Sequence, residues 1–220
     1  MVRKLSGNMR IRVHRFLPVT EAEGPGQRAA LWVQGCPIRC PGCFNRQTWS
    51  FRKGCWRTVG DLFRQIAEHP GLEGVTFTGG EPFAQARPLA ALGRACRDAG
   101  LSVVTYTGYN YGRVRRSKRR DWKALLDVTD LLLAGPFVKE LVDSSRPWVG
   151  SSNQEFVFLT DKYCHLNENC APSPNNLEVR IDKLSGLSLN GTAPESDIKA
   201  IRQELARLGV HLSVESKGAS

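Results

Sequence analysis

Three cysteines, Cys36, Cys40 and Cys43, lie within eight positions of one another in the stretch "GCPIRCPGC". Thiolates bind zinc and iron–sulfur clusters, and both kinds of site usually take four protein ligands. Pro37 and Pro41 keep this loop out of regular secondary structure, so that three sulfur atoms can converge on one point. A metal site that leaves one coordination position open is typical of catalysis rather than of a structural role.

The spacing of the cysteines also permits two less specific interpretations. The three side chains could be unrelated and buried, or they could bind zinc together with a distant His or Cys. A second motif, "GGEP" from Gly79 to Pro82, begins 36 residues after Cys43 and favours a functional site. Adjacent glycines let a backbone approach a ligand closely, and the carboxylate of Glu81 can accept hydrogen bonds from an ammonium group. In isolation, "GGEP" could also be a simple turn between a strand and a helix.

Short apolar runs alternate with amphipathic segments through the first two thirds of the chain. Strands are expected at 29–35, 74–80, 101–109 and 131–137, and helices at 58–71 and 86–100. This alternation predicts right-handed β–α–β units and a parallel sheet. Thr58 is expected to cap the first helix, and Cys96 to lie on the buried face of the second. Both motifs follow strands, at the edge of a parallel sheet where active sites collect.

The last third of the chain is less regular. Strands are expected at 155–159 and 177–181, with a further short strand in 184–195, a helix at about 193–208 and a final strand at 210–214. Thr192 and Glu195 form a capping-box pattern at the start of this helix. Its apolar stripe consists of Ile198, Ile201, Leu205 and Leu208. The expected fold class is α/β, with a single domain over 1–220, a core at about 10–160 and an irregular β/α extension at about 161–220.

The composition is that of an ordinary folded protein of 220 residues, 41% hydrophobic and 24% charged. No apolar stretch approaches the ~18 residues of a membrane span, and the N-terminus lacks the apolar region of a secretory signal. We therefore expect a cytoplasmic protein with no membrane partner. In that compartment, seven cysteines indicate metal or redox chemistry more than disulfides.

The net charge of +10 is partly local, because the stretch "RVRRSKRR" (113–120) holds six arginines or lysines in eight positions. The plain interpretation is a solvated, mobile loop. The more specific interpretations are a binding surface for an anionic protein or for nucleic acid. No recognisable nucleic-acid-binding motif accompanies the stretch, so a nucleic-acid partner is not expected.

A C-x3-C-x2-C loop after one strand and "GGEP" after the next resemble the radical S-adenosylmethionine (SAM) superfamily. The resemblance implies a partial (incomplete) TIM-like barrel in which Cys36, Cys40 and Cys43 bind one 4Fe-4S cluster, whose fourth iron is left for SAM. It also implies a set of residues that bind SAM. These are Gly79, Gly80, Glu81 and Pro82, then Phe44 and Asn45 after the last cysteine, and Thr105, Tyr106 and Thr107 at the end of the next strand.

Further segments resemble the activating proteins of anaerobic ribonucleotide reductases. They are "GPGQRAALWVQGC", "CPGCFN", "TYTGY", "LLLAGPFVKEL" and "GSSNQ". The resemblance implies reduction of the cluster by a one-electron donor such as flavodoxin or ferredoxin, and cleavage of SAM to a 5′-deoxyadenosyl radical. That radical would take a hydrogen atom from a glycine of a partner glycyl radical enzyme, since this chain carries no obvious glycyl-radical segment. Further candidate residues for contact with SAM are Gly135, Pro136, Ser151, Ser152 and Asn153.

Two other functions stay open at this point. A radical SAM enzyme that acts on a small molecule or peptide, such as a 7-carboxy-7-deazaguanine synthase-like lyase, carries the same two motifs. A non-enzymatic zinc-binding or scaffold protein would use the cysteines only to hold its fold. Cys164, His165 and Cys170 could bind a second metal, but a C-x5-C spacing is weak and ordinary loop residues are the expectation.

Overall fold

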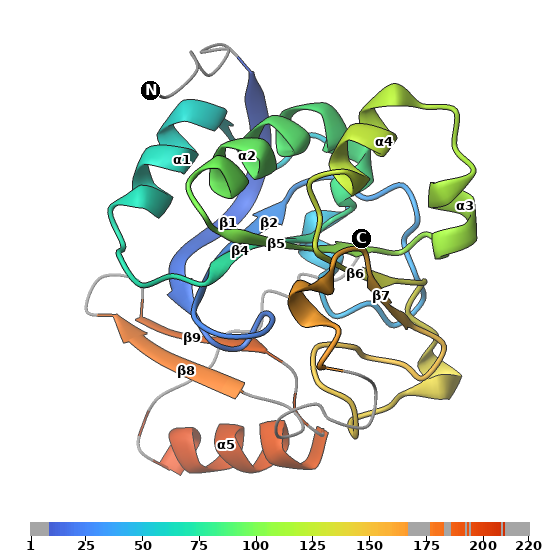
Figure 1. The fold of residues 1–220 in the computed structure, drawn as a ribbon. Helices are drawn as coiled ribbons and strands as arrows, with labels where there is room; N and C mark the ends of the chain where they lie inside the picture. The colour runs from blue at the N-terminus through green and yellow to red at the C-terminus, as the bar shows by residue number, and fades with distance from the viewer. Residues whose placement is uncertain are drawn as a thin grey trace.

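A seven-stranded mixed sheet forms the centre of the molecule (Figure 1). The computed structural model describes residues 9–166, 177–182, 186–191, 193, 195–207 and 209. The strands are β1 (Arg10–Thr20), β2 (Arg28–Val33), β3 (Cys55–Thr58), β4 (Gly74–Gly79), β5 (Ser102–Thr107), β6 (Leu131–Ala134) and β7 (Glu155–Phe158), in the spatial order β3-β1-β2-β4-β5-β6-β7.

The four central strands β2, β4, β5 and β6 are parallel, which confirms the α/β class expected from the sequence. The strands at both edges are antiparallel to their neighbours: β1 pairs with β2 and β3, and β7 pairs with β6. The expectation of an all-parallel sheet is therefore correct only for the centre. Polar residues interrupt β1, "RIRVHRFLPVT", so it does not have the apolar pattern of a buried parallel strand.

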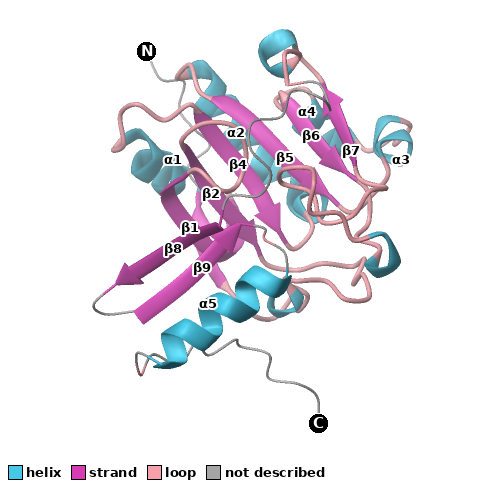
Figure 2. Cartoon of the chain, turned by 90° about the horizontal axis from the view of Figure 1, so that it is seen from below, coloured by secondary structure: helices cyan, strands magenta, loops and turns pink. Residues whose placement is uncertain are grey.

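Helices cover one face of this sheet (Figures 1 and 2). They are α1 (Val59–Ala67), α2 (Ala86–Asp98), α3 (Tyr111–Arg115) and α4 (Arg120–Leu126). Short 3-10 helices occur in the loops, at Arg46–Thr48, Pro82–Gln85, Lys139–Leu141 and Asp161–Tyr163. Leu62, Leu89 and Trp122 pack with Phe77 of the sheet in one core, and Cys96 is completely buried there, as predicted. The Thr58 hydroxyl accepts a hydrogen bond from the Asp61 N–H, which confirms it as the N-cap of α1.

The opposite face of the sheet carries a smaller core of Val104, Leu131, Leu133, Val149 and Tyr163. The completely buried Arg28 lies at the start of β2. Its guanidinium donates to Thr76 Oγ1 (2.8 Å), Val75 O (3.2 Å), Ser102 Oγ (3.2 Å) and Tyr163 Oη (3.1 Å). Because a buried charge must be hydrogen-bonded, this network joins the N-terminal ends of three parallel strands to the segment after β7.

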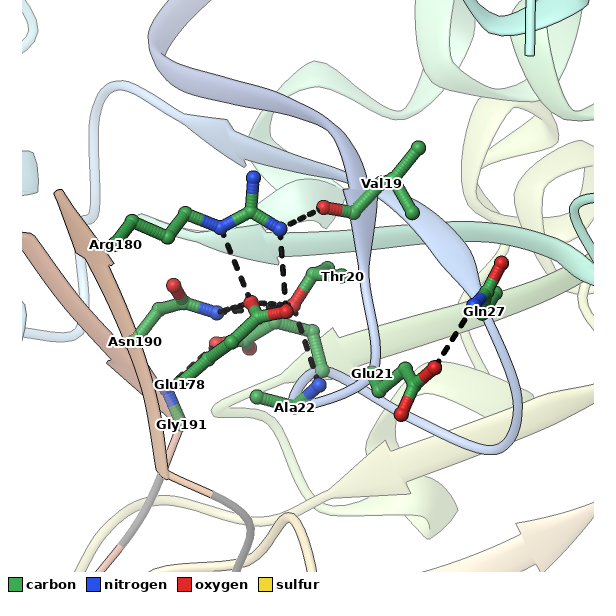
Figure 3. Close-up of polar contacts among 10 residues, drawn as sticks. Val19, Thr20, Glu21, Ala22, Gln27, Glu178, Arg180, Asn190 and Gly191 are labelled. Carbon is green, nitrogen blue, oxygen red and sulfur yellow. Dashed lines mark hydrogen bonds and ion pairs between the residues drawn. The ribbon is translucent and has the colours of Figure 1, made fainter. Parts of the chain in front are cut away.

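A separate antiparallel hairpin, β8 (Leu177–Asp182) and β9 (Gly186–Gly191), docks on the end of β1 (Figure 3). The Thr20 hydroxyl donates to Glu178 Oε2 (2.6 Å) and accepts from Asn190 Nδ2 (2.9 Å). Arg180 donates to Val19 O and pairs with Glu178. The strand predicted at 177–181 is thus confirmed, and it belongs to this hairpin rather than to the main sheet.

The last helix, α5 (Glu195–Arg207), agrees closely with the predicted 193–208. Its expected stripe is only partly buried, because Ile198, Ile201 and Leu205 each keep intermediate exposure. Thr192, Leu208 and the strand expected at 210–214 lie outside the described residues. Among the residues that the structure describes, no helix is long and apolar enough to cross a membrane.

The basic stretch 113–120 is more ordered than the mobile loop expected from its charge. Its first residues belong to α3 and its last begins α4. Val114 is buried in the main core, and the guanidinium of Arg113 lies 4.5 Å from the centre of the Tyr109 ring. A prediction from charge density alone gave a loop because it does not take into account that Val114 can be buried or that Arg113 can contact the Tyr109 ring.

Candidate functional site

The cysteine loop, residues 34–45, leaves the C-terminal end of β2 and is fixed by the segment that follows it. Gly35 N–H donates to Thr48 O (2.7 Å), and Cys36 N–H donates to Trp49 O (3.1 Å). Gly35 has φ +103°, a conformation that favours glycine. The loop therefore starts in one defined direction at the edge of the sheet, as its position in the sequence predicts.

The second half of the loop is a tight turn that holds the other two cysteines. Cys43 N–H donates to Cys40 O (3.1 Å), and Gly42 between them has φ +78°. The N–H of Asn45 donates to the Sγ of Cys43 at 3.4 Å. Asn45 therefore contributes its backbone, rather than its side chain, to the surroundings of the last cysteine.

Burial raises the pKa of the Cys36 and Cys40 thiols above the ordinary value. Backbone N–H groups act in the opposite direction by stabilising the thiolates: those of Arg39 and Ile38 at Cys36, and that of Phe137 at Cys40. Metal ligation requires the thiolate, so metal binding at this loop releases protons. The donors that surround the sulfur atoms suit that charged form.

The two glycines of "GGEP" bring the end of β4 against the end of β2 and the start of the cysteine loop. A Cβ on Gly79 would lie 2.7 Å from Cα of Trp32, and a Cβ on Gly80 would lie 2.5 Å from Gly35 O. The Gly80 N–H donates to Val33 O at 2.8 Å. The close approach that glycines permit is thus used here by the protein's own backbone, and it joins the two motifs into one site.

Glu81 is completely buried, and its carboxylate already has three hydrogen-bond donors. It accepts from Phe83 N–H (2.9 Å), Gly108 N–H (2.9 Å) and Thr107 Oγ1 (3.0 Å). Burial raises the pKa of Glu81 to about 7, and the three donors act against this rise. An ionised carboxylate offers about four acceptor positions, so at most about one is left for a ligand. Glu81 mainly joins the ends of β4 and β5.

At the end of β5, the structure places Thr107 rather than Thr105 near "GGEP". The Thr105 hydroxyl is buried 2.9 Å from that of Thr129, on the helix-covered side of the sheet. Tyr106 lies on the opposite side, where burial raises the pKa of its hydroxyl. The Thr107 hydroxyl donates to Glu81 and accepts from the Tyr109 N–H (3.1 Å). Alternation along the strand explains why Tyr106 lies on the opposite face, whereas Thr105 and Thr107 share a face and differ because only Thr107 lies at the end of the strand, beside Glu81.

The two later candidate segments lie together beside the end of β5. Asn153 Nδ2 donates to Pro136 O (2.8 Å), and the Gly135 N–H donates to Thr107 O (3.0 Å). Ser151 is completely buried, whereas the side chain of Ser152 is exposed. Asn153 Oδ1 is buried without a hydrogen-bond partner among the described residues. Such an acceptor is unfavourable by ~1–3 kcal/mol, so it is suited to a ligand donor.

Exposed apolar side chains lie beside this site. Phe44 is 67% exposed, and its ring packs edge-on against Phe137 with centroids 5.1 Å apart. Leu141 and Val142 are 43% and 60% exposed. The N–H of Ser152 donates to Leu141 O (2.8 Å), which links these residues to the Ser151–Asn153 segment. Clustered apolar residues on a surface are typical of a contact with another molecule.

Two glutamines position the site, and the sequence analysis missed both. Gln34 is 1% exposed, and its Nε2 donates to Gln47 O (3.0 Å) and Ser50 O (2.8 Å). Gln85 Nε2 donates to Arg12 O (2.9 Å) and Gln34 O (3.0 Å). For Gln34 the sequence did carry a signal, because it is a polar residue directly after the buried strand β2, and a buried amide needs hydrogen-bond partners.

The other cysteine and histidine candidates do not join this site. Cys164 and His165 are exposed, and Cys170 lies outside the described residues. Cys55 is also exposed, on β3. The alternative of a second metal site therefore stays untested, and ordinary loop residues remain the expectation for Cys164 and His165.

A 4Fe-4S cluster fits the residues at the loop. Within the described part of the chain, no three Cys, His, Asp or Glu side chains are close enough to share a single metal ion. A cluster does not require this, because each thiolate binds a different iron atom. The chemistry of the residues also fits: three thiols lie on one loop, and N–H groups that can donate to sulfur surround two of them.

Comparison with known proteins agrees with this geometry. A family described as "4Fe-4S single cluster domain" matches residues 22–157. The anaerobic ribonucleoside-triphosphate reductase-activating protein of Salmonella typhimurium is 32% identical over 152 residues, which are 66% of this chain and 96% of the relative. The protein of the same name from Enterobacteria phage T4 is 31% identical over 155 residues, 67% of this chain and 94% of its own length.

A solved structure, that of QueE from Escherichia coli, matches with a TM-score of 0.39 and 21% identity over 46% of this chain and 54% of the other. The sequence relatives are far more similar, and they are covered almost completely. From its cysteine loop, the match to the cluster family and these relatives, the chain belongs to the 4Fe-4S single cluster domain family and, within it, to the anaerobic ribonucleoside-triphosphate reductase-activating proteins.

Proposed function

We propose that this chain is a radical SAM enzyme that installs a glycyl radical on a partner such as anaerobic ribonucleotide reductase. When bound, the reduced cluster and SAM supply a 5′-deoxyadenosyl radical that can abstract a hydrogen atom. The observation that carries the proposal is the direct backbone contact between the two motifs. Gly80 N–H donates to Val33 O and Glu81 N–H to Gly35 O, so the cysteine loop and "GGEP" form one site.

In this proposal Cys36, Cys40 and Cys43 hold the cluster and leave one iron for SAM. Gly79 to Pro82 form the wall beside the cysteine loop, and Glu81 fixes that wall through its three hydrogen bonds. The buried carboxylate is thus chiefly a positioning group. Asn153 Oδ1 is the acceptor left open for a polar group of SAM.

The flanking residues take different parts in the proposal. Phe44 and Asn45 lie directly after the last cysteine, and the Asn45 N–H already donates to Cys43. Tyr106, on the face away from the helices, stays a candidate SAM contact. The hydroxyl of Thr105 is bonded to Thr129, which supports a packing role for it instead.

The surface beside the site supports a folded protein as the substrate rather than a small molecule. Phe44, Leu141 and Val142 leave large apolar surfaces exposed there, as expected of a protein contact and not of a closed pocket. The glycyl radical enzyme would supply the glycine from which the hydrogen atom is taken. A small-molecule lyase and a scaffold protein are both less well supported, because neither accounts for this exposed surface together with the relatives' names.

Three broader features complete the proposal. The open seven-stranded sheet with helices on one face is an incomplete TIM-like barrel. Residues 10–160 form the catalytic core of a single domain, to which the hydrogen-bonded β8–β9 hairpin and α5 add an extension. Flavodoxin or ferredoxin supplies the electron, and the protein works in the cytoplasm.

The test is anaerobic reconstitution with iron and sulfide, followed by dithionite and SAM. We expect 5′-deoxyadenosine, and with anaerobic ribonucleotide reductase present we expect a glycyl radical signal in electron paramagnetic resonance. The Cys40→Ala variant should lose both the cluster absorption and SAM cleavage, whereas Cys55→Ala, on the exposed β3, should keep both. A fully loaded cluster that yields no 5′-deoxyadenosine would refute the proposal. Cleavage of SAM without radical transfer would refute only the choice of partner.

A further inference from the structure

The stretch 113–120 presents a set of cations beside the cysteine loop. Arg113, Arg115, Arg116, Lys118, Arg119 and Arg120 are all exposed. Among the ion pairs that the structure describes, only Arg119 takes part, with Asp121 at 2.6 Å. We name these six side chains the basic surface. Because the other five cations take part in no ion pair that the structure describes, the cluster creates a strong positive potential.

The basic surface is held in place rather than mobile. Val114, between two of its cations, is 1% exposed in the main core. Arg113 lies 4.5 Å from the centre of the Tyr109 ring, and Arg119 lies 5.1 Å from that of Trp122. Cation–π contacts of this kind restrict the side chains while leaving their charges at the surface. Such an arrangement is suited to binding a partner of opposite charge.

The basic surface is also next to the candidate cluster site. Ile38, between the first two cysteines, contacts Gly108, because a Cβ on Gly108 would lie 2.7 Å from Ile38 Cδ1. Gly108 directly precedes Tyr109, on which Arg113 stacks, and α3 begins at Tyr111. Two further exposed cations, Arg39 and Lys139, lie on the cysteine loop and beside Gly42.

We propose that the basic surface is the docking site for an acidic one-electron carrier protein, of the flavin or iron–sulfur type, that reduces the cluster. The inference rests on the function proposed above. The step moves one electron from the reduced carrier to the oxidised cluster, so the carrier is oxidised by one electron and no atom is transferred. Transfer requires a short distance between the two redox groups, and a cationic surface adjoining the cysteine loop orients an acidic carrier there.

Electrostatic attraction of this kind acts mainly on the rate of association. It raises association rates by about 10–10³-fold at low salt, and the gain falls as ionic strength rises. A nucleic acid would also be attracted by the charge. An acidic carrier is favoured because the surface adjoins the redox site and no nucleic-acid-binding motif accompanies it.

The test uses the double variant Arg115→Glu/Lys118→Glu, in which neither residue makes an aromatic contact or ion pair that the structure describes. Its control is Lys199→Glu/Arg202→Glu on α5, which makes the same four-unit change in charge. Figures 1 and 2 both show α5 well away from α3 and α4.

Flavodoxin and ferredoxin are the carriers. Their binding to the chain before cluster loading is measured by fluorescence anisotropy at 0.05 and 0.5 M salt, and 5′-deoxyadenosine formation after loading is measured with reduced carrier or with dithionite.

We expect R115E/K118E to weaken carrier binding and carrier-driven 5′-deoxyadenosine formation about tenfold or more at 0.05 M salt. The loss should shrink at 0.5 M salt, where the Debye length is only a few ångströms. The dithionite-driven rate and the K199E/R202E control should equal the wild type.

Three results would overturn the inference. The first is carrier binding that is unchanged in R115E/K118E, and the second is an equal loss of carrier binding in the α5 control. The third is a short RNA or DNA duplex that binds the wild type more tightly than the carrier does, where R115E/K118E abolishes binding of the duplex but not of the carrier. If dithionite itself yields no product from the loaded wild type, the proposed function fails. The binding measurement on the unloaded chain still decides the docking surface.

Discussion

Replacing Gly80 by alanine should separate the two halves of the candidate site. The added Cβ would lie 2.5 Å from Gly35 O and 2.9 Å from Gly35 C, and these backbone atoms cannot rotate away as a flexible side chain could. Overpacking of this kind is unfavourable by about 1–3 kcal/mol. The shift also weakens the hydrogen bonds Gly80 N–H to Val33 O and Glu81 N–H to Gly35 O, each worth about 0.5–1.5 kcal/mol. We expect G80A to lower the free energy of unfolding by about 2–4 kcal/mol.

Gly60 provides the matched control, because its added Cβ meets no atom closer than 4.0 Å. It lies within α1, where replacing glycine by alanine stabilises a helix by about 0.5–1 kcal/mol. The assay is urea unfolding of the reduced protein without iron, followed by circular dichroism, together with the iron content after reconstitution. G80A should unfold at lower urea than the wild type and take up less iron, whereas G60A should be at least as stable and load fully. A G80A protein with wild-type stability and full iron content would refute the idea that the glycines serve to join the two motifs.

Three further predictions concern the rest of the fold. Arg28→Met removes the buried guanidinium from its network and should lower the free energy of unfolding in urea by about 3–5 kcal/mol, whereas Arg94→Met on the surface of α2 should change it by less than about 0.5 kcal/mol. Burial raises the pKa of Glu23 to about 7, so the folded state keeps a proton that the unfolded state loses near pH 4. The retained proton stabilises the folded state by at most about 3 kcal/mol. This stabilisation is complete below about pH 4 and is lost as pH rises through 7. Glu23→Gln should flatten that decrease between pH 5 and 8 in urea midpoints, and an unchanged slope would contradict the assignment. Thr20→Val removes the hydroxyl between Glu178 and Asn190 and should speed hydrogen exchange of the β8 and β9 amides at least tenfold relative to those of β4. Exchange of the β8 and β9 amides at the wild-type rate would count against the contact.

The centre of the fold could be predicted from the sequence because its signals are local. Apolar runs placed β2, β4, β5 and β6, and Thr58 marked the start of α1. β1 was missed, since its burial depends on β2 and β3 on either side of it rather than on its own composition. The antiparallel edges were missed for the same reason.

The candidate site shows the same division. The spacing of the cysteines and of "GGEP" identified the two motifs, and the relatives confirm the family to which they belong. The sequence could not show that Gly80 contacts Gly35, or that Thr107 and not Thr105 reaches Glu81. Those facts depend on the register between β2, β4 and β5, which no single segment determines.

The backbone contact between Gly80, Glu81 and the cysteine loop would also link the two binding events of the proposed function thermodynamically. Under the proposed function, iron at the loop and SAM beside "GGEP" would both favour the arrangement of Val33, Gly35 and Gly80 that these hydrogen bonds hold. Reciprocity then requires that each ligand raise the affinity of the other by the same factor. Loss of iron would then lower the affinity for SAM, so that an incompletely loaded enzyme would hold SAM less tightly.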